Sequence, residues 1–170
     1  MGRNPPGVLF AAVAFVGAIM PARPVAQEPG RVTGRTETGL YRLSVVEPGY
    51  DVTVTETERA ETFSVLEMNG LVPTVTAGGV VLFRAVYDIA RERKFEFAFV
   101  LPPRAGQAGG STTRGSDGRR VSLLAKVFMT NDEKTPVKVL LGADYGEEAR
   151  EVFDARGYMS VAQLASMFGR

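Results

Sequence analysis

The chain has 170 residues, of which 45% are hydrophobic and 23% are charged, and its formal net charge is +1. This length suits one domain with a buried core, and the composition is that of a globular protein rather than a disordered one. The absence of Cys and His excludes disulfides, thiolate or imidazole metal sites, and every catalytic mechanism that needs a Cys or His side chain.

The first 26 residues have the layout of a secretory signal peptide. Arg3 precedes an apolar run at residues 8–20, and a segment rich in proline and small residues follows. This run would span about 20 Å as a helix, which is short of the ~30 Å hydrocarbon core of a bilayer. We therefore expect residues 1–26 to be removed and the protein to be exported, to the periplasm or outside the cell, without a membrane span. A retained anchor or a buried helix is the alternative.

The charge of the remaining chain argues against nucleic acid as a partner. Two of the 20 basic residues, Arg3 and Arg23, precede Gln27, which leaves 18 basic residues against 19 acidic ones. Phosphate recognition needs a concentrated basic surface that neutralises several charges at once. We expect no binding to nucleic acid.

The chain after the signal is predicted to begin with a flexible lead and then a single α+β domain. Residues 27–39 are rich in Gly, Thr, Arg and Pro without periodicity, which is typical of a flexible segment. The domain is expected over residues 40–170. Its start, residues 40–69, shows alternating apolar residues and predicts a three-stranded meander, with Asn69-Gly70 as the turn that ends it.

A helix and a strand are expected next. Thr76 can cap a helix that begins near Ala77, and the apolar residues that follow have helical spacing. Residues 95–101 alternate aromatic and other residues, which predicts a strand with a buried aromatic face. Residues 103–119 lack aromatic and large aliphatic side chains, and predict a mobile loop.

The last part of the chain is predicted to hold a hairpin and two helices. Residues 121–128 and 137–141 are strongly apolar and flank a polar connection, which predicts two paired strands. Residues 145–156 then have helical spacing and end at Gly157, and Ser160 can cap a final helix. The order of elements predicts an α+β fold, with a largely antiparallel sheet of about six strands and helices packed on one face.

Four arginines in or next to the predicted loop are the candidate ligand-binding residues. They outnumber the single acidic residue of that segment, Asp117, so the loop is locally positive. A positive mobile segment suits an acidic protein surface or anionic lipid head groups. A solvated loop without a partner explains the same residues. The four candidates are Arg104, Arg114, Arg119 and Arg120.

Acidic residues form the densest set of titratable groups, and paired carboxylates can act as acid and base or bind calcium. The spacing of a calcium-binding loop is absent, however, and solvated charges at hairpin turns explain the same residues. We therefore assign no catalytic residue, no metal ligand and no cofactor. The acidic residues considered are Glu56, Glu58, Glu61, Glu67, Asp132, Glu133 and Asp144.

The function that the sequence favours is a small exported domain that binds an unknown protein or envelope component without catalysis. This expectation follows from the absent His and Cys and from the absence of catalytic spacing. The alternative is a carboxylate-dependent or metal-assisted hydrolase that uses residues among Glu56, Glu58, Glu61, Asp132 and Asp144. A structural domain of a larger assembly is a third possibility.

Overall fold

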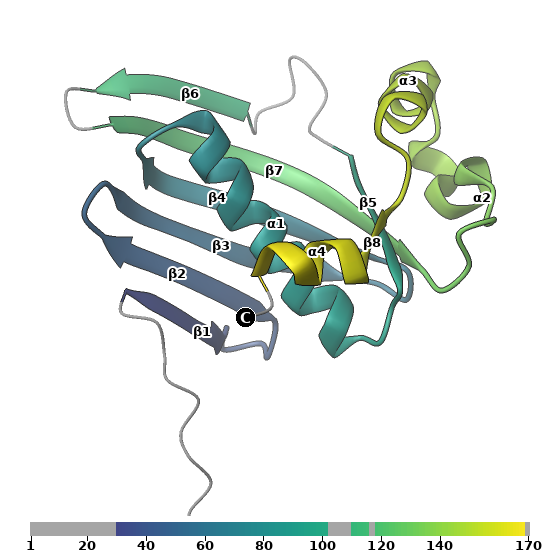
Figure 1. Ribbon diagram of the computed structural model, residues 1–170, viewed down its shortest axis with the longest axis horizontal. Helices are drawn as coiled ribbons and strands as arrows, with labels where there is room; N and C mark the ends of the chain where they lie inside the picture. Colours follow the sequence, from purple (N-terminus) through teal and green to yellow (C-terminus); the bar gives the residue numbers. More distant parts are fainter. Residues whose placement is uncertain (1–29, 102–109, 116–117, 169–170) are drawn as a thin grey trace, which may run out of the picture.

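The computed structural model describes residues 30–101, 110–115 and 118–168. These residues form one antiparallel sheet and four α-helices, which confirms the predicted α+β class (Figure 1). The strands are β1 (Arg31–Arg35), β2 (Tyr41–Glu47), β3 (Tyr50–Arg59), β4 (Phe63–Val72), β5 (Phe97–Leu101), β6 (Gly110–Gly115), β7 (Gly118–Thr130) and β8 (Met159–Ser160). The helices are α1 (Val75–Glu92), α2 (Val137–Leu141), α3 (Glu147–Arg156) and α4 (Val161–Phe168), with a short 3-10 turn at Gly142–Asp144.

The sheet has eight strands in the described part of the chain, where about six were predicted. Their order is β1-β2-β3-β4-β7-β5-β8, and β6 pairs with the remaining part of the long strand β7. The predicted meander is present as β2, β3 and β4. The chain before it does not stay a flexible lead, because β1 pairs with β2 over Arg31–Arg35.

Asn69-Gly70 does not form the predicted turn but lies inside β4. Gly70 faces Val52 on one side and Val121 on the other. Its φ is +137°, and a Cβ atom there would lie 2.1 Å from the carbonyl oxygen of Asp51. Glycine is therefore needed at this position for close strand packing rather than for a chain reversal.

Helix α1 covers one face of the sheet, and α4 packs against α1 (Figure 1). The helix begins slightly earlier than predicted, because Thr74 and not Thr76 is its N-cap and accepts a hydrogen bond from the Ala77 N–H. The predicted cap of the last helix is present: the Gln163 N–H donates to Ser160, and the Ser160 N–H donates to the Gln163 side chain. Phe168 of α4 then packs on Tyr87 of α1, with ring centroids 6.2 Å apart.

Helices α2 and α3 pack on the opposite face of the sheet, near β5, so the helices do not all lie on one face. Along β5, Ala98 and Val100 belong to the core under α1, whereas Phe99 belongs to a second core. Phe99 meets Phe153 of α3 edge to face, with centroids 5.3 Å apart. Since successive strand residues point to opposite faces, β5 is buried on both sides.

Residues 137–141 form helix α2, not the predicted strand. Val137, Leu140 and Leu141 pack in the second core, whereas Lys138 and Val139 are exposed. This spacing is helical, and Pro136 precedes the first turn, where proline is tolerated. A short apolar run does not distinguish a strand from a helix, and the tertiary contacts decide it.

Part of the predicted loop at residues 103–119 is strand. Strand β6 pairs with β7 from Gly110 to Gly115, and β7 already begins at Gly118. Residues 102–109 and 116–117 lie outside the described part of the chain, as do residues 1–29 that include the predicted signal. Over the described ranges, no helix has both the length and the apolar character needed to cross a bilayer.

Candidate functional site

The structure describes the backbone at three of the four predicted arginines, Arg114, Arg119 and Arg120. Arg104 lies outside the described residues. Arg114 and Arg119 are directly opposite each other in the backbone register of the β6–β7 pair. Arg120 follows Arg119 along the same strand and therefore lies on the other face. The proposal that these arginines bind a ligand therefore stays a prediction.

The carboxylates of the alternative hydrolase are also dispersed. Glu58, near the end of β3, and Glu61, in the β3–β4 turn, are both exposed. Asp144 pairs with Lys126, with 2.5 Å between the Oδ2 and Nζ atoms, and Asp132 accepts a hydrogen bond from the Lys134 N–H within its own turn. Among the described residues, no three acidic side chains come close enough together to hold a metal ion.

Glu56 is completely buried, although its sequence context indicated a solvated turn. Its Oε1 atom accepts hydrogen bonds from Arg59 Nε (2.9 Å) and Ser64 Oγ (2.6 Å). Its Oε2 atom accepts from the Tyr41 N–H (3.0 Å) and from a second Arg59 nitrogen (2.5 Å). Burial alone would raise the pKa of Glu56, but these hydrogen bonds outweigh it and hold the pKa below its ordinary value. The carboxylate is a structural anchor.

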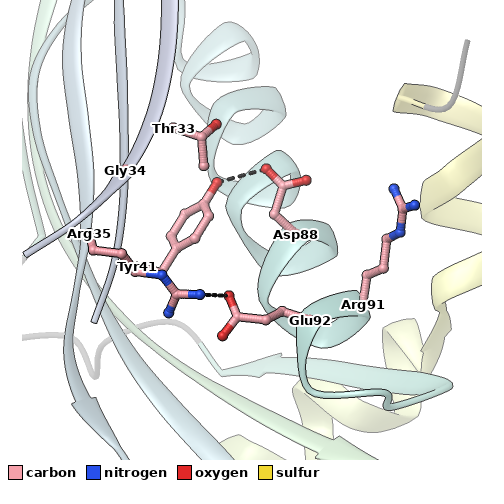
Figure 2. Close-up of a pocket in the computed structure, with 7 residues that line it drawn as sticks. All are labelled: Thr33, Gly34, Arg35, Tyr41, Asp88, Arg91 and Glu92. Carbon is pink, nitrogen blue, oxygen red and sulfur yellow. Dashed lines mark hydrogen bonds and ion pairs between the residues drawn. The ribbon is translucent and has the colours of Figure 1, made fainter. Parts of the chain in front are cut away.

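A groove of about 550 Å³ lies between the edge strand β1 and helix α1. Figure 2 shows its two walls: residues of β1 on one side and acidic side chains of α1 on the other. Tyr41 of β2 forms the floor. We call this the β1–α1 groove; it is lined by Thr33, Gly34, Arg35, Tyr41, Asp88, Arg91 and Glu92.

Tyr41 and Asp88 fix the floor of the groove. The Tyr41 hydroxyl donates to Asp88 Oδ2 at 2.7 Å (Figure 2). Burial raises the pKa of Tyr41, and the charge of Asp88 and this hydrogen bond raise it further. Arg84 holds the same carboxylate from the next turn of α1, at 3.2 Å. The floor of the groove is therefore the protonated Tyr41 hydroxyl, which is hydrogen-bonded to an Asp88 carboxylate that already forms an ion pair with Arg84.

The walls carry cations that remain accessible. Arg35 of β1 reaches Glu92 of α1 at 2.7 Å, and Arg59 contacts the same carboxylate at 3.2 Å. The Arg35 side chain is still 48% exposed, so this ion pair is weak and exchangeable. Arg91 lies at the rim and turns away from β1 (Figure 2), with a long contact of 3.5 Å to the Tyr87 hydroxyl.

The backbone of β1 contributes polar groups to the same place. Two hydrogen bonds show which residues of this segment face β2. The Val46 N–H donates to the Gly30 carbonyl, and the Thr36 N–H donates to the Leu40 carbonyl. In an antiparallel pair these bonds alternate, so the register places the N–H and C=O groups of Thr33 and Arg35 on the side away from β2. In the described part of the chain, β1 pairs with no strand except β2.

Sequence reasoning missed this groove because its walls are far apart in the chain. Thr33 and Arg35 lie in a segment that was predicted to be flexible, and Asp88 and Glu92 are simply polar positions on a helix. Residues 27–39 have no periodicity as a whole, but the short run 31–35 within them alternates Arg31, Thr33 and Arg35 with Val32 and Gly34, and this was the one available signal.

The chain matches no protein family model, no curated protein and no solved structure. The site must therefore be interpreted from its own geometry.

Proposed function

We propose that the chain is an exported, non-enzymatic binding module and that its ligand lies in the β1–α1 groove. The observation that carries the proposal is the groove itself: a polar recess of about 550 Å³ bounded by accessible side chains and by backbone groups of an edge strand. Ligand sites are concave and hold a few fixed polar groups. The export part of the proposal rests on the sequence pattern of residues 1–26.

The groove favours binding over catalysis because its acidic groups already have partners. Asp88 accepts from Tyr41 and pairs with Arg84, while Glu92 pairs with Arg35 and Arg59. A general acid or base needs a carboxylate that exchanges protons with the substrate. Carboxylates that are paired with arginines instead position cations and hydrogen-bond donors for recognition.

The experiment begins with the chain recovered from the periplasmic fraction and from the medium of an expressing bacterium. Its intact mass should lack about 22 to 26 N-terminal residues. Thermal unfolding is then followed with calcium, magnesium, acidic, basic and neutral peptides, and anionic lipid vesicles. A ligand at about a hundred times its Kd adds about 2.7 kcal/mol, which raises Tm by roughly 5 to 10 °C.

Two tryptophan variants locate the response. Thr33→Trp places a bulky side chain on the α1 side of β1 and fills the groove, whereas Val32→Trp places the same group on the other face of the same strand. We expect Thr33→Trp to abolish the rise in Tm and Val32→Trp to retain it. A rise that survives in Thr33→Trp would place the ligand elsewhere, and a flat panel would count against a binding role. Retention of residues 1–26 in the recovered protein would contradict export.

A further inference from the structure

We infer that the groove binds an extended acidic peptide that adds to the sheet as a strand beside β1. This inference rests on the proposed function and names the class of ligand. Strand addition requires an edge whose backbone groups are open, and within the described residues β1 meets this requirement at Thr33 and Arg35. An added strand would continue the antiparallel sheet past β1.

The side chains of an added strand would alternate between two different surroundings. Residues that point to the α1 side would enter the groove, next to the Arg35 side chain and near the rim at Arg91. Residues between them would point to the other face, where Val32 is 59% exposed and a Cβ built on Gly34 meets nothing within 4 Å. The structure thus favours a peptide with groove-facing residues of one kind and apolar residues between them.

Charge decides which side chains suit the groove. Its lining holds two arginines, Arg35 and Arg91, and two carboxylates, Asp88 and Glu92. Ion pairs extend this set through Arg59 and Arg84 to Glu56, so the whole network has four arginines and three carboxylates. The carboxylates are each engaged by at least one arginine, whereas Arg91 makes no ion pair with a described residue. The balance is positive, and glutamate or aspartate side chains at alternate positions complement it.

Other occupants of the edge fit the observations less well. A second copy of the chain paired through β1 would place Arg31 and Arg35 of both copies along one seam, and like charges there are unfavourable. The chain's own first 29 residues carry two arginines and one glutamate, so they do not supply the alternating acidic side chains.

The test uses the full chain and a synthetic peptide of three Glu-Val repeats with blocked ends, followed by titration calorimetry. The control peptides contain Lys-Val repeats, or the same residues in the order Glu-Glu-Glu-Val-Val-Val. We expect saturable binding of the alternating acidic peptide alone, and its loss at high salt. Free glutamate and phosphate serve as probes for a simple anion site, and we expect no heat from either.

Variants of the protein separate the contribution of the Arg35 charge from that of the backbone hydrogen bonds of β1. Arg35→Ser should weaken binding about tenfold, whereas Arg42→Ser, on the open face of β2, should leave it unchanged. Thr33→Pro removes an outward N–H that no described strand uses, and an edge strand tolerates proline there. We expect Thr33→Pro to weaken binding about tenfold and Thr33→Val to have little effect.

Several results would overturn the inference. Two binding results would do so: equal affinity for the acidic and basic peptides, or an affinity that neither Arg35→Ser nor Thr33→Pro changes. Two structural results would do so as well: a dimer that forms through β1, or a β1 edge that the chain's own N-terminal residues cover. If no peptide binds but another compound raises Tm and Thr33→Trp abolishes that rise, the proposed function stands and only the class of ligand is wrong.

Discussion

At the scale of single residues, Glu56 shows how far the sequence determines a side chain's role. Residues 52–56 alternate strictly, and Glu56 shares the face of Val52 and Val54, which are buried. This alternation predicts that Glu56 is buried in the core. Its negative charge, however, favoured the interpretation that it lies in a solvated turn. The structure resolves the conflict with Arg59, Ser64 and the Tyr41 N–H, which satisfy all the buried oxygen atoms of this carboxylate.

Replacement of this anchor should cost stability. Glu56→Gln keeps the size of the side chain but removes the charge that holds Arg59, and breaking a buried ion pair costs about 3 kcal/mol. Urea unfolding at pH 7 measures the loss. The matched control is Glu58→Gln, two residues along the same strand and exposed, for which we expect a change within about 0.5 kcal/mol.

The loss should depend on pH in a defined direction. The pKa of Glu56 is lowered in the folded state, so its contribution to the free energy of unfolding is complete above the pKa of the unfolded chain, ~4.3. This contribution disappears as the pH falls through the pKa of the folded state. The difference between the wild type and Glu56→Gln should thus be constant above about pH 5 and shrink below about pH 4. A difference that grows as the pH falls would show that the carboxylate is not stabilised in the fold.

At the scale of elements, long periodic segments were predictable and short ones were not. The strands of the meander and the helix over Val75–Glu92 follow from their spacing, and the final helix follows from both its spacing and its cap, Ser160. The cap of the longer helix was predicted two residues too late. Val137–Leu141 was too short for its period to be recognised, and only the second core around Phe99 and Phe128 selects the helix. Strands β1 and β6 are rich in Gly and Thr, and their pairing with a longer neighbour forms them.

Gly70 supplies an element-scale prediction. Its positive φ and the 2.1 Å approach to the Asp51 carbonyl oxygen leave no room for a methyl group between β3 and β4. Gly70→Ala should destabilise the protein by about 3 kcal/mol, because it adds strain and separates two paired strands. Gly79→Ala on α1, where nothing lies within 4 Å, should instead stabilise it by roughly 0.5 to 1 kcal/mol. Thermal or urea unfolding of both variants decides the point, and equal effects would contradict this role of Gly70.

At the scale of the whole molecule, the sheet separates two cores and leaves an edge strand beside α1. Helices α1 and α4 lie over one face of the sheet (Figure 1), and the main core is beneath them. The second core joins α2 and α3 to the opposite face near β5. The candidate site forms where the first strand of the sheet passes α1, so it joins residues more than fifty positions apart. The fold class could be predicted from the sequence, but the proximity of β1 and α1 could not, because the order and the edges of the strands depend on long-range pairing.

The predicted basic loop and the β1–α1 groove would bring a ligand into contact with different strands. A basic loop would bind through positions near Arg114 and Arg119 in the β6–β7 pair, at the other end of the strand order from β1. A ligand in the β1–α1 groove would instead contact β1, α1 and Tyr41 of β2. A residue-resolved measurement can therefore distinguish them.

The most direct test is amide hydrogen exchange of the full chain, read residue by residue, with and without the alternating Glu-Val peptide. We predict that exchange at Thr33 and Arg35, whose N–H groups point away from β2, slows by at least about tenfold at saturation. Exchange at Val32 and Gly34, which already bond to β2, should change little. Slower exchange confined to Gly110–Gly115, or no change along β1 while the peptide is bound, would contradict a binding site in the β1–α1 groove.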